Sequence, residues 1–182
     1  MQTNIYLGLV HHPVYNKHND VVTTSITNLD IHDIARSCKT FGLKKFFVIT
    51  PLETQKLLLN RILIFWKSNI AKEYNSDRVQ ALSLIEYAVD IETVVKQISL
   101  QEDDCLVVST TAARLKQQIS IYDLKKSSSP VLLLFGTGNG LTKEIHEQAD
   151  HVLKPIEGEG NYNHLSVRSA VAIVLDRLSS EK

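Results

Sequence analysis

Three glycines at alternate positions form the segment of this 182-residue chain whose residue types and spacing point most directly to ligand chemistry. Gly136, Gly138 and Gly140 lie within residues 131–141 (VLLLFGTGNGL), directly after an apolar run of strand length. Glycine permits positive φ and lets backbone N–H groups approach a ligand closely. A tight turn without a ligand is the alternative, because a glycine-rich loop alone is a weak motif. The G-x-G-x-G spacing near the C-terminus matches neither the dinucleotide fingerprint nor a P-loop.

A second segment, residues 153–170 (LKPIEGEGNYNHLSVRSA), combines a proline and two glycines with a polar cluster. Asn161, Tyr162, Asn163 and His164 stand at the start of a predicted helix and can simply cap it. The same side chains can also offer hydrogen-bond donors and acceptors to an adenine, a ribose or a nucleobase. This segment is therefore a second candidate for ligand contact.

Strand-like and helix-like segments alternate along the chain and must position these groups. Mostly apolar segments of strand length occupy residues 5–10, 45–50, 84–88, 105–109 and 131–135, and we expect each to form a strand. Helical spacing and capping residues predict helices over 28–40, 53–67, 77–81, 90–99 and 164–178, and residues 11–20 read as a polar loop. This order predicts a single α/β domain over residues 1–182, with a mainly parallel sheet and helices on both faces. Ligands bind beyond the carboxyl ends of such strands, and Thr110 and Thr111 follow one of them.

Net charge, cysteine content and the length of the apolar runs bear on which partners and which cellular compartment the protein can have. The 20 basic and 20 acidic side chains give a net charge of zero, which counts against RNA binding without excluding it. Two cysteines without a CxxC pattern indicate a reduced, cytoplasmic protein. No apolar run is long enough to span a bilayer, and the first ten residues lack a signal-peptide pattern, so we expect no membrane association.

The motifs FGTGNGL, LKPIEG and YNHLSVRSA resemble the C-terminal half of SPOUT RNA methyltransferases, especially a little-characterised bacterial group. The resemblance implies a deep trefoil knot over about residues 105–182 and S-adenosylmethionine (SAM) as the cofactor. It implies that three loops, 110–112, 136–141 and 156–166, hold SAM mostly through backbone groups. The cofactor-binding residues implied are Thr110, Thr111, Leu134, Phe135, Gly136, Thr137, Gly138, Gly140, Ile156, Gly158, His164, Leu165 and Ser166.

The resemblance extends to residues 36–42 (RSCKTFG), which match an R-[ST]-x-x-x-F-G pattern of the SPOUT ribose methylases. It implies a homodimer in which Arg36 acts beside the partner's cofactor, on a phosphate or the target hydroxyl. A solvated or ion-paired helix residue is the alternative. The chain departs from the ribose methylases near Gly138, where they have glutamate, and at His164 and Asp30, where they have asparagine. Methylation of a ribose and of a base nitrogen both stay open.

A base is needed if the methyl acceptor carries a proton, and His164 is the first candidate for that base. Asp30 is the second, and Arg36 would orient an RNA phosphate. Each of these three residues can instead have a purely structural role, such as capping or packing for His164.

Three further cations are candidate RNA contacts. Arg114 contacts a phosphate or is an ordinary helix residue, and Arg168, one turn after His164, binds phosphate or makes an interface ion pair. Lys17 lies in the polar loop with His11, His12 and His18, which is either an RNA contact or a plain exposed loop. We expect no metal site there, because cysteine and second-shell signatures are missing.

We expect SAM-dependent methylation of RNA by a homodimer that binds no DNA. Three alternatives remain at this point. They are a non-catalytic dimer of the same fold that binds RNA or protein, a methyltransferase with a protein or small-molecule substrate, and an unknotted nucleotide-binding domain.

Overall fold

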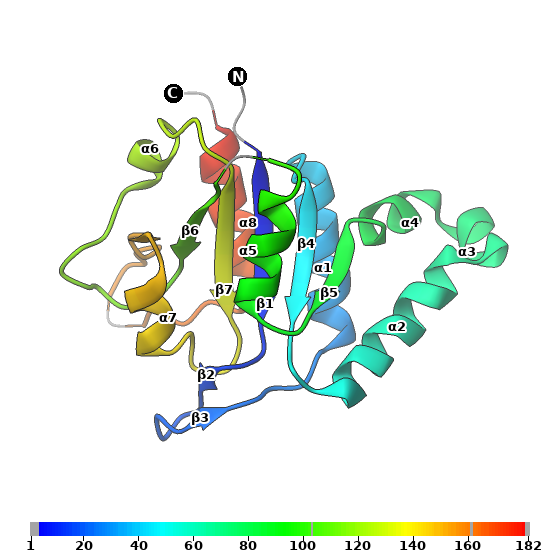
Figure 1. Cartoon of the computed structure of the whole chain (residues 1–182), viewed down its shortest axis with the longest axis horizontal. Helices are drawn as coiled ribbons and strands as arrows, with labels where there is room; N and C mark the ends of the chain where they lie inside the picture. Colours follow the sequence, from blue (N-terminus) through cyan, green and yellow to red (C-terminus); the bar gives the residue numbers. More distant parts are fainter. Residues whose placement is uncertain (1–3, 103, 161, 181–182) are drawn as a thin grey trace.

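A six-stranded sheet forms the centre of the computed structural model, which describes residues 4–102, 104–160 and 162–180. The strands run in the order β5-β4-β1-β7-β6-β8, and all of their pairings are parallel (Figure 1). Their bounds are β1 (Ile5–Val10), β4 (Lys45–Ile49), β5 (Ile85–Ala88), β6 (Leu106–Ser109), β7 (Val131–Gly136) and β8 (His151–Val152). The predicted α/β class with a parallel sheet is confirmed, although the two-residue β8 was too short to predict.

Helices cover both faces of the sheet. Alternate residues of the strands divide between two cores, as Leu7 and Leu9 show on one face and Tyr6 and Val10 on the other. The first core takes side chains from α1 (Asn28–Thr40), α2 (Glu53–Lys67), α3 (Asn69–Tyr74), α4 (Ser76–Leu82), α6 (Ile121–Leu124) and α8 (Val167–Ser179). The second takes them from α5 (Ile91–Ser99) and α7 (Lys143–Gln148). The sequence reasoning did not foresee α3 and α7.

The carboxyl ends of the central strands lie level. Val10 pairs with Ile49 on one side and with Gly136 on the other, so β1, β4 and β7 all end at the same edge of the sheet. The residues that follow them, including the glycine loop, are therefore brought together there. This is the edge at which parallel sheets bind their ligands.

Helix ends differ from expectation in two places. The hydroxyl of Thr27, and not the side chain of Asn28, caps α1 by accepting the Asp30 N–H at 3.1 Å. The last helix begins at Val167, where Ser166 caps it by accepting the Ser169 N–H at 3.3 Å. His164 therefore lies before the helix instead of at its start, because a serine hydroxyl is the stronger N-cap.

A small hairpin lies at the same edge, with its first strand and its turn inside the predicted polar loop (residues 11–20) and its second strand just after it. Its strands, β2 (Val14–Tyr15) and β3 (Val21–Val22), are antiparallel and have two residues each. A strand of two residues is too short to show an alternation of polar and apolar positions, so the sequence pattern could not predict these two strands.

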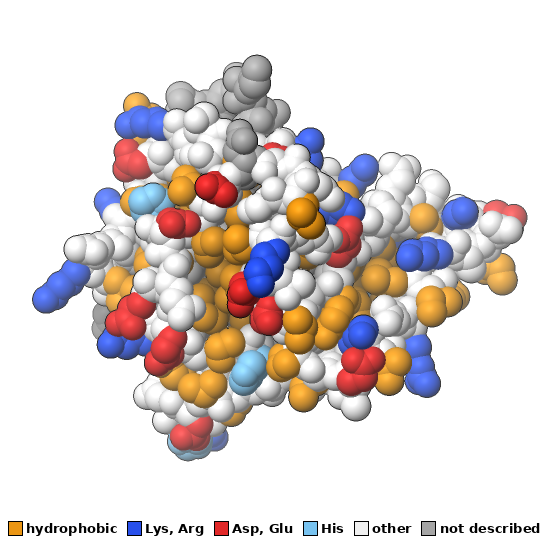
Figure 2. Space-filling model, viewed as in Figure 1, with side chains coloured by type: hydrophobic (Ala, Val, Ile, Leu, Met, Phe, Trp, Pro, Cys, Tyr) orange, Lys and Arg blue, Asp and Glu red, His pale blue; other side chains and the backbone are white. Residues whose placement is uncertain are grey.

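Helices α2, α3 and α4 extend beyond the β5 edge of the sheet (Figure 1). Figure 2 shows hydrophobic side chains reaching the surface over this extension, with lysine and arginine side chains between them. Ile64 and Ile70, for example, are 68% and 73% exposed. In the part of the chain that the structure describes, no helix is both long and apolar enough to cross a bilayer.

Candidate functional site

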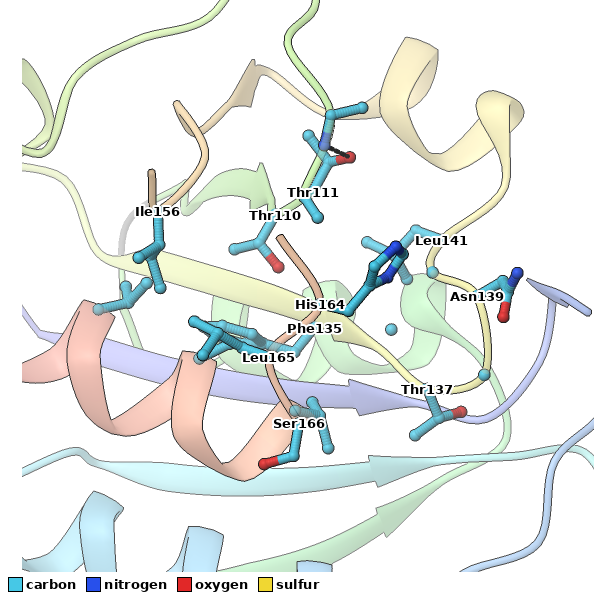
Figure 3. A pocket seen from close by; sticks show the side chains of 18 of the residues that line it. Thr110, Thr111, Phe135, Thr137, Asn139, Leu141, Ile156, His164, Leu165 and Ser166 are labelled. Carbon is cyan, nitrogen blue, oxygen red and sulfur yellow. Dashed lines mark hydrogen bonds between the residues drawn. The ribbon is translucent and has the colours of Figure 1, made fainter. Parts of the chain in front are cut away.

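A cavity of about 770 Å³ opens at the edge where β1, β6 and β7 end, a volume suited to a cofactor-sized ligand. Three loops and the first turn of α1 surround it, and Figure 3 shows their side chains turned toward one another. The predicted residues that line it are Thr110, Thr111, Phe135, Gly136, Thr137, Gly138, Gly140, Ile156, His164, Leu165, Ser166 and, from α1, Asp30. The two motif segments and the loop after β6 therefore meet, as expected.

Two predicted cofactor residues do not line the cavity. Leu134 is fully buried in the second core, because alternation along β7 turns it away from the site. Its carbonyl oxygen nevertheless holds the loop after β6, since it accepts the Thr110 N–H at 3.0 Å and the Thr110 hydroxyl at 2.9 Å. Gly158 lies exposed, outside the cavity wall.

Further wall residues belong to the predicted loops or to segment 153–170 without having been singled out as cofactor-binding residues. They are Ala112, Asn139, Leu141, Leu153, Lys154, Asn163, Val167 and Ala170. The sequence analysis did not foresee five others, which are Thr24, Ser25, Thr27, Ala113 and Val174. The hydroxyl-rich run at residues 23–27 (TTSIT) was the available signal for the first three, because side-chain hydroxyls gathered before a helix often form hydrogen bonds to ligands or cap the helix. Ala113 and Val174 reach the cavity only through the fold.

The glycine loop needs glycine at two positions for reasons of space. A Cβ on Gly136 would lie 2.6 Å from the backbone nitrogen of Leu141, where the loop turns back on itself. Gly138 has φ +58°, and a Cβ there would lie 2.7 Å from the carbonyl oxygen of Tyr15. The hairpin thus packs against the outer side of the loop, and the absence of a side chain makes that approach possible.

Backbone hydrogen bonds fix the hairpin to the glycine loop. The Tyr15 N–H donates to the Gly140 carbonyl at 2.9 Å, and the Asn139 N–H donates to the Tyr15 carbonyl at 2.8 Å. These reciprocal bonds hold the loop from outside, so its inner side is left for a ligand.

A chain of hydrogen bonds runs below the loop and ends on a buried histidine. The Thr137 hydroxyl donates to the Val10 carbonyl at 3.0 Å and is bonded to the Thr24 hydroxyl. Thr24 in turn lies 3.0 Å from Nδ1 of His11. Because each hydroxyl has one proton, Thr24 donates to Thr137 and His11 donates from Nδ1. Burial disfavours a second proton on this ring, and its Nε2 is buried without a partner among the described residues.

Burial lowers the pKa of His11 from 6.5 to about 4. The unfolded chain therefore binds this proton at a higher pH than the folded chain, and stability falls as the pH drops from about 6.5 toward 4. The difference corresponds to about 2–3 kcal/mol of unfolding free energy lost between pH 7 and pH 4.5. Urea denaturation at both pH values should show a smaller loss in His11→Gln. Equal losses in the two proteins would contradict the assignment.

The carboxylate of Asp30 enters the cavity wall already paired. It accepts a hydrogen bond from the Thr27 hydroxyl at 2.6 Å, and Nε of Arg168 lies 3.2 Å from its other oxygen. A second nitrogen of Arg168 donates to Asp33 at 2.9 Å. Arg168 thus joins α8 to α1 through ion pairs within the chain, and its expected contact with a phosphate or a partner subunit stays a prediction. It also shares no helical face with His164, because that residue precedes the helix.

The other predicted RNA contacts occupy different places. Arg114 belongs to an irregular loop and not to a helix, and its guanidinium is 2.8 Å from Glu157. This ion pair connects the loop after β6 to the segment before α8, as does the bond from the Asn163 amide to the Ala112 carbonyl at 3.2 Å. Lys17 lies exposed at the turn of the hairpin.

Arg36 does not reach the cavity of its own chain. Its side chain is exposed and lines a shallow groove between α1 and α8. The other two histidines of the N-terminal loop are not gathered around a common point, since His12 bonds to Thr23 at 2.9 Å. Within residues 4–102, 104–160 and 162–180, no three His, Cys, Asp or Glu side chains cluster in a way that suits a metal ion.

A parallel sheet whose carboxyl edge holds a cofactor-sized cavity, closed by a glycine loop and by the segment before the last helix, defines an α/β protein of the SPOUT methyltransferase fold. The chain belongs to the family described as SAM-dependent RNA methyltransferase, whose model matches residues 4–180. Solved structures with the same fold include a probable methylase family protein from Haemophilus influenzae Rd KW20, with TM-score 0.65 and 18% identity over 98% of this chain and 66% of that one. Another is the TrmH/SpoU tRNA modifying enzyme of Aquifex aeolicus, with TM-score 0.57 and 17% identity over 98% and 74% of the two chains.

Sequence relatives agree with the family. The chain is 41% identical to a tRNA (guanine-N(1)-)-methyltransferase of Oleidesulfovibrio alaskensis over 177 residues, which are 96% of this chain and 42% of the relative. It therefore spans about two fifths of the length of that curated relative. An uncharacterized protein of Aquifex aeolicus is 32% identical, over 97% of this chain and 89% of its own length.

Proposed function

We propose that the cavity binds SAM and that the chain transfers the cofactor's methyl group to RNA. The observation that carries the proposal is the meeting of the three loops around one cavity in a chain that belongs to this family. The AviRb methyltransferase of Streptomyces viridochromogenes, which has the same fold with TM-score 0.57 and 16% identity over 98% of this chain and 57% of its own, has been crystallised with AdoMet.

The cavity fits the cofactor in shape and in polarity. Phe135, Leu153 and Ile156 offer an apolar wall for a purine ring. The backbone N–H groups of Gly138 and Leu165 donate to no other described residue, so both are available to a ligand. These groups would hold the cofactor, which supplies an electrophilic methyl group on a sulfonium when bound. The protein's remaining task is to position the acceptor in line with it.

His164 would take the proton from the acceptor. Its imidazole is exposed within the cavity wall, and Figure 3 shows the ring turned into the space that the loops enclose. Asp30 is the second candidate, although its ion pair with Arg168 and its bond from Thr27 already occupy its oxygens.

Arg36 would serve the cavity of a partner subunit in a homodimer. Its exposed position on α1, outside the cavity of its own chain, supports this role. The same-fold SpoU structures support a trefoil knot within residues 105–182, formed where the chain passes from β8 through residues 153–166 into α8. Single-domain organisation over residues 1–182 is part of the same proposal.

RNA is the proposed acceptor because the family and the tRNA methyltransferase relatives share that substrate class in their descriptions. The guanine in the relative's name is not carried over, since the chain spans only 42% of that protein.

Titration calorimetry with SAM and with its demethylated product tests the cofactor site. We expect binding of both in the micromolar range, followed by transfer of labelled methyl groups from SAM to unmodified tRNA. If neither SAM nor its demethylated product gives a heat of binding, the proposal is wrong and a non-catalytic protein of the same fold is favoured. Cofactor binding without transfer to any RNA would favour a protein or small-molecule acceptor.

A further inference from the structure

A second hollow lies outside the cofactor cavity, between the start of α1 and the helical extension. This groove, of about 610 Å³, is bounded by α1, α2 and α4. The residues that matter for its chemistry are His32 from α1, Arg61, Phe65 and Trp66 from α2, and Arg78 from α4. Neither motif of the sequence analysis includes any of them.

The groove carries two arginines that form no ion pair with a described residue. Arg61 is exposed and Arg78 is half-buried. The acid of the groove, Asp33, already accepts a hydrogen bond from Arg168 at 2.9 Å. In a chain with zero net charge, the groove is therefore a local site for an anion.

Two buried nitrogen atoms in the groove lack hydrogen-bond partners. They are Nε of Arg78 and Nδ1 of His32, and both stay unpaired among the described residues. Buried polar atoms of folded proteins are nearly always paired, so these two point to a missing ligand or water. Burial and the nearby Arg78 also lower the pKa of His32, which fits a crowded and partly dry position.

Aromatic rings lie beside these cations. Phe65 is 54% exposed and meets Trp66 edge to face, with ring centroids 5.4 Å apart. The guanidinium of Arg78 lies over the Trp66 ring at 5.5 Å from its centroid. An exposed ring next to an unpaired arginine suits an unpaired nucleotide, whose base stacks on the ring while its phosphate meets the cation.

The groove and the cofactor cavity lie on opposite sides of one helical turn. Thr27 and Asp30 line the cavity, while Asn28 and Leu29, between them in sequence, line the groove. A strand with one nucleotide in the cavity therefore needs to cross only the first turn of α1 to reach the groove.

We propose that this groove binds single-stranded RNA next to the nucleotide to be methylated, with a base on Phe65 and phosphates on Arg61 and Arg78. The inference rests on the proposed function for its link to methyl transfer. RNA is favoured over a second protein because the groove offers two arginines without an ion pair among the described residues, next to an exposed aromatic ring.

Fluorescence anisotropy with a labelled single-stranded RNA dodecamer of mixed sequence tests the groove. Phe65→Ala should weaken binding by about 5- to 100-fold, since a stacked base is worth that much. Arg61→Ala should weaken it and lower the slope of log K against log salt by about 0.7 per lost phosphate contact. The matched controls on α2 are Ile64→Ala and Lys67→Ala, which are exposed but do not line the groove. Both should bind like wild type.

The fluorescence of Trp66 provides a direct measure of RNA binding in the groove, because Trp66 is the only tryptophan of the chain. Its emission should change as RNA is added to the wild type, and the change should shrink in Arg61→Ala. Wild-type affinity in both groove variants, or no RNA binding at all, would overturn the proposal. Sedimentation of the groove variants gives a further outcome. If they bind RNA like the wild type but change their oligomeric state, the proposal is overturned and the groove is a protein interface.

Calorimetry with SAM distinguishes a failure of the RNA-groove proposal from a failure of the proposed methyltransferase function. The groove variants should bind SAM as tightly as the wild type, because they leave the cavity wall intact. Failure of the wild type to bind SAM, with RNA still bound through the groove, would overturn the methyltransferase proposal and leave the groove standing.

Discussion

Gly138→Ala is expected to weaken SAM binding at least about tenfold and to slow methyl transfer by about 100-fold, since displacements near 1 Å have effects of that size. The added Cβ would lie 2.7 Å from the Tyr15 carbonyl oxygen, which is backbone and cannot rotate away. Either the hairpin or the glycine loop must then move. The loop would lose the bonds that Tyr15 makes to Asn139 and Gly140, and with them its shape.

Gly42→Ala is the matched control for this variant. Gly42 has φ +72°, close to that of Gly138, but a Cβ there meets nothing within 4 Å. Both alanines carry the strain of a positive φ, of about 1 kcal/mol, and only one collides with a neighbour. Calorimetry should show normal SAM affinity in Gly42→Ala. Equal losses in the two variants would mean that a general loss of stability, and not the hairpin contact, lowers the affinity for SAM.

His164→Ala is expected to lower the rate of methyl transfer by about 100- to 10,000-fold, the usual contribution of a general base. SAM affinity should change much less, because the ring only borders the cofactor cavity. Apart from an edge contact with Tyr162 at 5.5 Å, the ring has no partner in the described part of the chain, so its removal should cost little stability. Single-turnover rates with saturating SAM would measure the effect.

Two variants make this test decisive. His18→Ala removes another exposed histidine, at the hairpin, and should keep the wild-type rate. Asp30→Asn removes the charge of the second candidate base while preserving its shape. A large loss of rate in Asp30→Asn, with His164→Ala near normal, would transfer the role of base to Asp30.

The sequence predicted the sheet and its ligand edge well, because buried parallel strands leave a strong signal. Residues 46–49 and 131–135 are continuous apolar runs followed by loop residues, and the structure places them in β4 and β7. The level ends of β1 and β7 then bring Thr137 beside Val10, so the glycine loop had to lie at that edge.

Contacts between distant segments could not be predicted from one sequence. Arg168 and Asp33 are 135 residues apart, and no local pattern links them. The packing of the hairpin against Gly138 could not be predicted for the same reason, although Gly138 itself was predicted to bind the cofactor. Leu134 is different, because alternation along β7 already placed it on the same face as Leu132 and away from Phe135.

The first turn of α1 separates the cavity proposed to bind SAM from the groove proposed to bind RNA. The Thr27 cap and the Arg168 ion pair hold this turn, while the cavity touches Asp30 and the groove touches Leu29. Whatever displaces this turn from one side is felt on the other. By thermodynamic linkage, the factor by which cofactor alters the affinity for RNA must equal the factor by which RNA alters the affinity for cofactor. If both proposals hold, this shared turn predicts that the two ligands alter each other's affinity, and equilibrium titrations in either order of addition should give the same coupling factor.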